Sequence, residues 1–219
     1  MYMQTLIINA HPDCENKGSF TYKLQELFLA KYKAEFPDDN PEILNLYAIN
    51  LPRIETTELL HIWNKQRNQE TLSEKEKEIE VITSGLLTQF KNKHRIVIIS
   101  PLHNFNVTSR LKDYMDNILL ARQTFQYTNE GSVGLMTDNY KALYLQASGS
   151  IYTNNDRYTP LEFSYQYLKA MFEDIMGFDA LYVARAQGTA ILPEEEVLDS
   201  AKEDLAKVFE KFYDKQLTL

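Results

Sequence analysis

The sequence predicts an α/β fold in which five parallel strands alternate with helices that cover both faces of one sheet. Short apolar runs rich in β-branched residues recur along the chain, separated by longer segments with apolar residues at helical spacing. The chain has 219 residues, of which 44% are hydrophobic, and no repeat or linker divides it. We therefore expect residues 1–219 to form a single domain.

The first part of the chain predicts two strands joined by a helix. Residues 4–9 ("QTLIIN") form a short apolar run, and residues 19–35 place apolar side chains every three or four positions. Residues 42–47 ("EILNLY") alternate in polarity, which is typical of a strand. A proline and a polar run interrupt residues 48–72, where we expect a loop and a short helix.

The middle of the chain predicts a helix, a central strand and a second helix. Ser73 and Glu76 have the spacing of a capping box, so a helix should begin there. The run "RIVIIS" at 95–100 indicates a strand buried on both faces. Residues 107–121 carry an apolar stripe and predict the next helix.

The last part predicts two further strands, each followed by a helix. We expect residues 122–140 to be irregular and residues 141–147 ("KALYLQA") to form the fourth strand. A helix should run over 159–177, with a proline in its first turn and a glycine at its end. The fifth strand follows at 179–185, and residues 193–213 form a helix with acidic residues in its first turn.

The expected strand order is 2-1-3-4-5. No Gly-x-Gly-x-x-Gly turn follows the first strand, which disfavours a dinucleotide-binding fold. In the order 2-1-3-4-5, ligands bind above the carboxyl ends of strands one and three, where the chain direction across the sheet reverses.

Composition excludes several classes of protein. The net charge is −8 with no cluster of Lys and Arg, so nucleic acid is not expected as a partner. No apolar run is long enough to span a membrane. The opening residues lack the basic region of a signal peptide, and Cys14 is the single cysteine, so we expect a cytoplasmic protein. The four histidines stand in different contexts, so we expect no metal site.

The loop after the first strand, "AHPDCENKGSF", leads into a helix N-terminus, which favours phosphate. The candidate phosphate-binding residues are His11, Lys17, Gly18 and Ser19. An alternative is open: Ser19 only caps the helix, and His11 with the following proline only shapes a turn. The Gly-x-x-x-x-Gly-Lys-Ser/Thr pattern is absent, which disfavours a nucleoside triphosphate.

Two further loops offer backbone donors and flat side chains. They are "PLHNFN" after the third strand and "ASGSIY" after the fourth. Together with a phosphate loop they suit flavin mononucleotide (FMN), whose ring needs hydrogen bonds along one edge in a mostly apolar slot. Pro101 makes the first of these loops rigid, Asn104 tolerates unusual backbone angles, and Phe105 presents a flat face. Tyr152 in the second loop is a candidate cover for the ring.

The segments "PLHNFNVTSRLKDYMD" and "TFQYTNEGSVGLM" resemble the FMN-dependent NADH azoreductases, which are also quinone reductases of the flavodoxin-like superfamily. That family has Pro-Met-Tyr-Asn-Phe-Asn in the first segment and Ser-Arg-Gly-Gly after the fourth strand. The resemblance implies that the ring-binding residues are Pro101, Leu102, His103, Asn104, Phe105, Ala147, Ser148, Gly149 and Ser150, and that the phosphate-loop serine is Ser19. The chain departs from it at His11, where the family has Ser, at His103, where it has Tyr, and at Ser148, where it has Arg. The first loop is more similar to that of the mammalian-type quinone reductases.

The resemblance implies a flavodoxin-like three-layer sandwich and an FMN-dependent NAD(P)H oxidoreductase that reduces quinones and azo compounds by ping-pong hydride transfer. NADH or NADPH is the implied donor. The flavin carries the hydride, so no side chain is required as a catalytic nucleophile, and His103 has at most a tuning role. Two alternatives are a flavodoxin-like electron carrier and a regulatory flavoprotein subunit. Turnover of NADH with a quinone would discriminate the enzyme from both.

The resemblance also implies a homodimer with both active sites at the interface. Phe125 and Tyr127 would then line a substrate slot over the flavin. The helix over 107–121 gives separate, weaker support. It carries Tyr114, Met115, Ile118 and Leu119, and apolar residues beyond the one face that packs on the sheet need a second cover. The alternative is that residues 48–72 of the same chain cover them.

Overall fold

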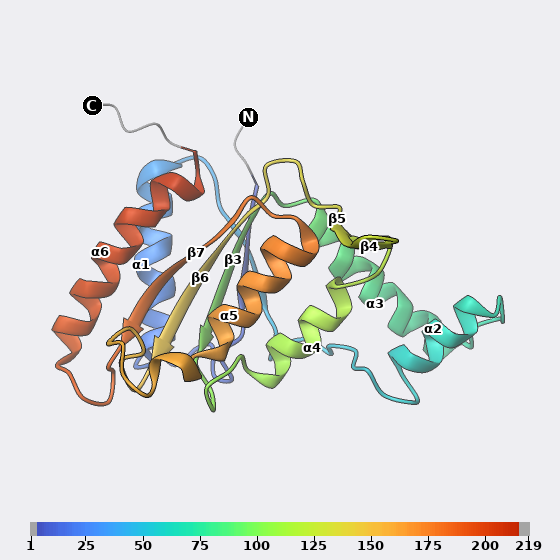
Figure 1. The fold of residues 1–219 in the computed structure, drawn as a ribbon, viewed down its shortest axis with the longest axis horizontal. Helices are drawn as coiled ribbons and strands as arrows, with labels where there is room; N and C mark the ends of the chain where they lie inside the picture. The colour runs from blue at the N-terminus through green and yellow to red at the C-terminus, as the bar shows by residue number, and fades with distance from the viewer. Residues whose placement is uncertain (1–3, 215–219) are drawn as a thin grey trace.

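The computed structural model describes residues 4–214 as a three-layer α/β/α sandwich (Figure 1). The middle layer is a five-stranded parallel sheet in the order β2-β1-β3-β6-β7. Its strands are β1 (Thr5–Asn9), β2 (Glu42–Asn45), β3 (Arg95–Pro101), β6 (Lys141–Ser148) and β7 (Ala180–Gln187). A separate hairpin supplies β4 and β5, so the sheet has the predicted order 2-1-3-4-5 when only its own strands are counted.

Helices cover both faces of the sheet. One face is covered by α1 (Phe20–Glu35) and α6 (Glu194–Phe212). The other is covered by α3 (Glu74–Lys91), α4 (Ser109–Ile118) and α5 (Phe163–Lys169), the last continuing as η2 (Ala170–Met176). This arrangement confirms the predicted α/β alternation.

The sheet strands are apolar on both sides because each side faces a helical layer. In β1, Ile7 packs in the cluster beneath α1 and α6, whereas Leu6 and Ile8 pack in the cluster beneath α3, α4 and α5. All three side chains are fully buried. Each buried aliphatic side chain contributes about 1.5–3 kcal/mol, so the period-two alternation of β1 supports both layers.

The predicted helix over 159–177 is interrupted. Residues Thr159–Leu161 form a 3-10 turn, η1, with the proline near its start. The α-helix begins only at Phe163, where the Glu162 side chain accepts the N–H of Tyr165, and its last part, η2, is π-helical and ends at Gly177. A local pattern of apolar spacing does not distinguish these three helix types.

Residues 122–140 contain a hairpin that the sequence did not predict. Its strands are β4 (Phe125–Thr128) and β5 (Gly131–Gly134). The strands have four residues each, and a Cβ on Gly134 would lie 2.4 Å from the backbone nitrogen of Gly177. The hairpin therefore approaches the backbone at Gly177 so closely that only glycine fits at position 134, and such a long-range contact leaves no periodic signal in the sequence.

Residues 48–72 form a loop and one short helix, α2 (Leu59–Arg67), as predicted. The capping box of Ser73 and Glu76 at the start of α3 is also confirmed. Lys65 of α2 lies 2.8 Å from the carboxylate of Glu76, and the hydrogen bond from Lys65, with those at Ser73, lowers the pKa of Glu76 to about 2. The cap of α3 therefore also fixes α2.

The helix α4 corrects one expectation about assembly. Tyr114, Met115 and Ile118 are fully buried within the chain itself, in the cluster that also contains Leu51. The side chain of Asn117 in the same helix donates to the carbonyl of Pro52 at 2.8 Å. The segment 48–72 thus helps to cover α4, and these three apolar residues do not require a partner subunit.

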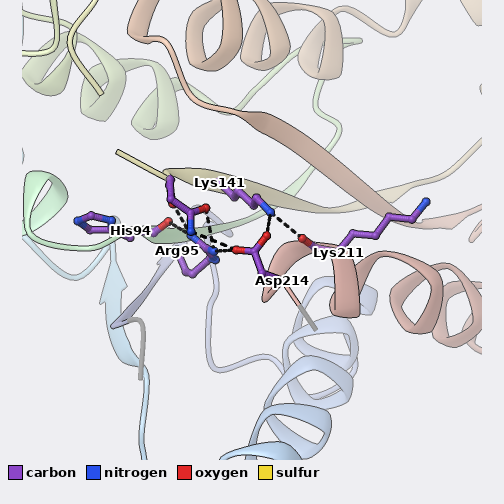
Figure 2. Close-up of polar contacts among 6 residues, drawn as sticks. His94, Arg95, Lys141, Lys211 and Asp214 are labelled. Atoms are coloured by element: carbon purple, nitrogen blue, oxygen red, sulfur yellow. Dashed lines mark hydrogen bonds and ion pairs between the residues drawn. The ribbon is translucent and has the colours of Figure 1, made fainter. Parts of the chain in front are cut away.

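The amino ends of the strands carry a polar cluster, the amino-end cluster, in which the charged side chains of Arg95, Lys141 and Asp214 meet (Figure 2). Asn139 belongs to the same cluster through its hydrogen bonds with Arg95 and Asp214. The fully buried guanidinium of Arg95 donates to the carbonyls of His94 and Asn139, at 2.9 and 2.6 Å, and pairs with Asp214. Lys141 also pairs with Asp214 and donates to the carbonyl of Lys211 at 3.0 Å. The cluster ties the end of α6 to β3 and β6.

Opposing effects act on the pKa of Asp214. Partial burial alone raises it, but the hydrogen bonds from Lys141 and Asn139 and the charges of Lys141 and Arg95 together lower it below the ordinary value. The burial of Arg95 lowers the pKa of its own guanidinium, and the charge of Asp214 opposes that shift. One carboxylate therefore balances two cations at this end of the sheet.

Candidate functional site

The candidate site lies at the carboxyl ends of β1, β3 and β6. The strand β1 leads to α1 on one face of the sheet and its neighbour β3 leads to α4 on the other, so the loops diverge between them. The hydroxyl of Thr108, before α4, donates to the carbonyl of Ala10 at 3.1 Å. This bond fixes the spacing of the two diverging loops.

The loop after β1 ends in a capped helix. Ser19 accepts the N–H of Tyr22 at 3.1 Å, so the interpretation of Ser19 as an N-cap is confirmed. Its hydroxyl hydrogen is still able to donate. The N–H groups of Phe20 and Thr21 have no acceptor among residues 4–214. These donors and the helix dipole favour an anion such as phosphate.

The other residues of this loop have separate roles. Gly18 donates to the side chain of Asn16 at 3.0 Å, and a Cβ on Gly18 would lie only 3.2 Å from that oxygen. The ring of His11 bonds the backbone of Asp13, with Nδ1 3.0 Å from the N–H nitrogen, so His11 shapes the turn. Lys17 is exposed beside the helix start, where its charge adds to that of the dipole.

The loop after β3 is a tight turn with unusual backbone angles. His103 and Asn106 exchange both backbone hydrogen bonds, at 2.9 and 3.0 Å. The two residues between them, Asn104 and Phe105, have φ of 45° and 67°, as in a type I′ turn. Such angles cost about 1 kcal/mol or more per non-glycine residue. The N–H groups of Asn104 and Phe105 have no acceptor among the described residues.

The loop after β6 supplies a second pair of free donors. The N–H groups of Gly149 and Ser150 also have no acceptor within residues 4–214. The carbonyl of Gly149 accepts the N–H of Ala190 at 3.1 Å, and the hydroxyl of Ser148 donates to the carbonyl of Ser150 at 2.9 Å. The loop is held from behind while its N–H groups remain available.

Backbone bonds and an aromatic contact bring the β3 and β6 loops together. Leu102, after Pro101, donates to the carbonyl of Ala147 at 2.7 Å. The rings of Phe105 and Tyr152 meet edge to face with centroids 6.3 Å apart, and Phe105 is 40% exposed. Burial raises the pKa of Tyr152 above its ordinary value. The two loops thus form one surface with donors and an aromatic face.

Phe125 and Tyr127 lie elsewhere in the chain. Both belong to β4, beside the helical layer and away from the carboxyl ends of the strands (Figure 1). They meet edge to face at 5.3 Å and line a hollow of about 550 Å³ with Trp63 and Leu120. Tyr127 is 75% exposed. A single chain does not bring these two candidates to the flavin-ring loops.

The site fits FMN by its donors. One helix N-terminus offers free N–H groups to a phosphate, and four further free N–H groups, of Asn104, Phe105, Gly149 and Ser150, suit the polar edge of a flat heterocycle. Within residues 4–214, no group of three or more His, Cys, Asp or Glu side chains is arranged to hold a metal ion. The same residues include no helix with the length and apolarity needed to cross a bilayer.

One polar group near the site was missed by reasoning from sequence. Glu162 falls within the helix predicted over 159–177 and is not among the candidate site residues, yet its carboxylate accepts a hydrogen bond from the amide of Gln146 of β6 at 2.6 Å. A glutamine inside a strand buried on both faces was the available signal, because a buried amide needs partners.

This fold and the position of the site define a flavodoxin-like protein. Residues 3–209 match the family described as having a flavodoxin-like fold. The chain is 54% identical over 213 residues to FMN-dependent NADH:quinone oxidoreductase 1 of Lactiplantibacillus plantarum, covering 96% of this chain and 99% of the relative. It is 51% identical over 214 residues to FMN-dependent NADH:quinone oxidoreductase of Streptococcus agalactiae, covering 98% and 100%.

A solved structure shows the same similarity. An FMN-dependent NADH-azoreductase from Bacillus anthracis in complex with FMN superposes with a TM-score of 0.90 at 45% identity, covering 97% of this chain and 100% of that one. The chain therefore belongs to the family of FMN-dependent NADH:quinone oxidoreductases.

Proposed function

We propose that this chain binds FMN and oxidises NADH to reduce quinones, and that it also reduces azo compounds, by a ping-pong cycle. The observation that carries the proposal is the set of free backbone N–H groups on three loops at one end of the sheet. The names of the relatives support FMN, NADH and quinone as the reactants. The chemistry that FMN supplies when bound is acceptance of a hydride from the donor and its transfer to the acceptor.

The residues of the chain bind and orient in this proposal. The start of α1, with Lys17, Gly18 and Ser19, holds the phosphate. The donors of the 103–106 turn and of Gly149 and Ser150 hold the polar edge of the ring. Phe105 and Tyr152 limit water at one border of the ring site, which favours transfer of hydride between stacked partners.

Turnover and flavin content test the proposed function. The purified protein should carry one FMN per chain and no FAD, as judged by chromatography of acid-released flavin. NADH should bleach the bound flavin in a stopped-flow experiment, and menadione should restore its colour with continued consumption of NADH. A protein that binds FMN without consuming NADH would be a carrier or a regulatory subunit instead.

We further propose a cytoplasmic homodimer in which Phe125 and Tyr127 lie over the partner's flavin. Supporting this, Ile54 and Tyr127 expose apolar surface around the hollow that both aromatic residues line, and the half-buried Leu119 lines it as well. Sedimentation at micromolar concentration should give about twice the chain mass of 25.6 kDa. Full activity of a monomer at nanomolar dilution would contradict both the dimer and the shared site.

A further inference from the structure

A buried carboxylate lies behind the two ring-facing loops. Glu162 is only 5% exposed, and its Oε1 accepts from the Ser164 hydroxyl at 2.5 Å and from the Tyr165 N–H at 3.0 Å. The amide of Gln146 donates to the same oxygen at 2.6 Å. Among residues 4–214, no Lys, Arg or His forms a direct ion pair with Glu162. A buried carboxylate without a direct counter-ion requires this full set of donors.

The amide of Gln146 links this carboxylate to a cation. Gln146 is fully buried in β6, and its Oε1 accepts from Nε of Arg185 in β7 at 3.1 Å. The guanidinium of Arg185 also lies over the ring of Tyr165, 5.0 Å from the centroid. Glu162 and Arg185 thus form a charge pair through one amide, which orients Gln146 in a single direction.

The network reaches the β3 loop through the backbone beside Glu162. The N–H of Phe163 donates to the carbonyl of Phe105 at 2.9 Å. That carbonyl belongs to the turn in which Asn104 and Phe105 have positive φ. The turn is therefore held by the first residue of α5, and the start of α5 is held by Glu162.

The network reaches the β6 loop through the strand itself. Gln146 directly precedes Ala147, whose carbonyl accepts the N–H of Leu102. The free N–H groups of Gly149 and Ser150 follow within four residues of Gln146 along the chain. One carboxylate therefore connects, from behind, the two loops whose donors form the ring-binding surface.

We propose that Glu162 is a positioning residue of the flavin-ring site. Its carboxylate caps the start of α5, which holds Phe105, and binds Gln146, which holds the end of β6. It thereby sets the relative positions of the two pairs of free N–H groups. The proposal rests on the proposed binding of FMN. It adds that FMN binding depends on a carboxylate to which no contact with the ring or the phosphate is assigned.

The test compares two glutamates in the same helical segment. Glu162→Gln replaces an acceptor of Gln146 by an amide that presents a donor in part. Glu173→Gln is the matched control, because Glu173 accepts the backbone N–H of Leu181 at 2.7 Å, at the opposite end of the sheet. Both variants perturb a contact from a carboxylate to backbone, but only Glu162 is linked to the ring loops.

Two readouts decide the proposal. The first is the FMN dissociation constant of the apoprotein, measured by the quenching of flavin fluorescence. The second is amide hydrogen exchange of residues 102–107 in the apoprotein. Glu162→Gln should raise the dissociation constant at least tenfold and accelerate exchange in 102–107, whereas Glu173→Gln should change the dissociation constant less than twofold and leave that exchange unaltered.

A milder variant and the second readout keep the test decisive. Glu162→Asp keeps a carboxylate near Tyr165 but shortens its reach to Gln146, so it should show the same two changes at smaller size in a folded protein. If both variants at Glu162 bind FMN with wild-type affinity and exchange normally over 102–107, the proposal is overturned. If the wild-type protein binds no FMN, the proposed function fails, and exchange alone decides whether Glu162 positions the loops.

Discussion

The two ends of the parallel sheet differ in whether their polar groups have hydrogen-bond partners within the chain. At the amino end, the guanidinium of Arg95 meets two carbonyls and Asp214, and only its Nε lacks an acceptor within residues 4–214 (Figure 2). At the carboxyl end, backbone N–H groups on three loops have no acceptor in that part of the chain. The first arrangement satisfies groups within the chain, and the second leaves donors for a ligand.

The comparison predicts that FMN binding and fold stability depend on different residues in this protein. The side-chain hydrogen bonds of Arg95 and Lys141 within residues 4–214 all join groups at the amino end of the sheet. The two ring-facing loops at the carboxyl end are held by a different network, around Glu162. Substitutions at one end should therefore change one property and leave the other. Each prediction below either breaks this separation or sharpens it.

Ser19→Asp should produce the largest effect. A carboxylate still caps the helix, but it places a negative charge beside the phosphate position at the start of α1. We expect the FMN dissociation constant to rise about 100-fold, roughly 3 kcal/mol, from charge repulsion and a lost donor. The thermal midpoint should change little, as measured by circular dichroism.

Ser19→Thr is the control, because it keeps both the cap and the hydroxyl. Its FMN affinity should stay close to that of the wild-type protein. A folded Ser19→Asp variant with unchanged FMN affinity would show that the phosphate binds elsewhere.

Arg95→Met should have the opposite pattern. It removes a fully buried cation together with its hydrogen bonds to the carbonyls of His94 and Asn139. Because Asp214 is partly exposed and keeps Lys141, we expect a loss of about 2 kcal/mol in the free energy of unfolding, less than for a fully buried pair. Urea denaturation of the apoprotein measures this loss.

The same variant should bind FMN normally once folded. Lys207→Met is a suitable control for stability, because its ion pairs with Glu203 and Asp204 are long and exposed. A large fall in FMN affinity in Arg95→Met would mean that the two ends of the sheet are coupled.

The order of the sheet could be predicted from sequence because each strand is a local apolar run between helices. All five sheet strands lie within two residues of the expected ranges. The hairpin β4–β5 could not be predicted from sequence, because it packs through Gly134 against Gly177, which is distant along the chain. The break between η1 and α5 within 159–177 likewise depends on Glu162, whose carboxylate caps α5 at Tyr165 and accepts from Gln146 of β6.

The candidate site was only partly predictable. The three loops follow from the strand order, and the residues expected to bind the ring were named largely by resemblance to a family. The positive φ angles of Asn104 and Phe105 and the free N–H groups of the turn needed the three-dimensional contacts. Those contacts, such as the bond from Phe163 to Phe105, join residues distant in sequence.

Acid unfolding should sharpen the comparison at the amino end. The pKa of Asp214 is lowered from its ordinary value of 3.8 in the folded state. Its stabilising effect is therefore complete above about pH 4 and is lost as the pH falls through the folded pKa. The difference in unfolding free energy between wild-type protein and Asp214→Asn, under about 1 kcal/mol for this partly exposed group, should shrink below pH 3.8.

Urea denaturation between pH 6 and pH 3 measures that difference directly. Glu203→Gln on the exposed side of α6 serves as the control and should show a flat difference. A difference for Asp214→Asn that grows as the pH falls would contradict the assigned direction of the pKa shift.

His103→Phe should have the smallest effect, because His103 contributes to the turn through its backbone. Its N–H and carbonyl bond Asn106, whereas its ring is exposed and has no hydrogen bond to residues 4–214. We expect the FMN dissociation constant and the rate of quinone reduction to change less than about threefold, within the range of an exposed substitution. Flavin titration and steady-state assays with NADH and menadione across pH 5 to 9 measure both. Retained FMN with complete loss of turnover would instead show that the imidazole donates a proton to the acceptor, and the carboxyl-end loops would then supply a catalytic side chain as well as backbone donors.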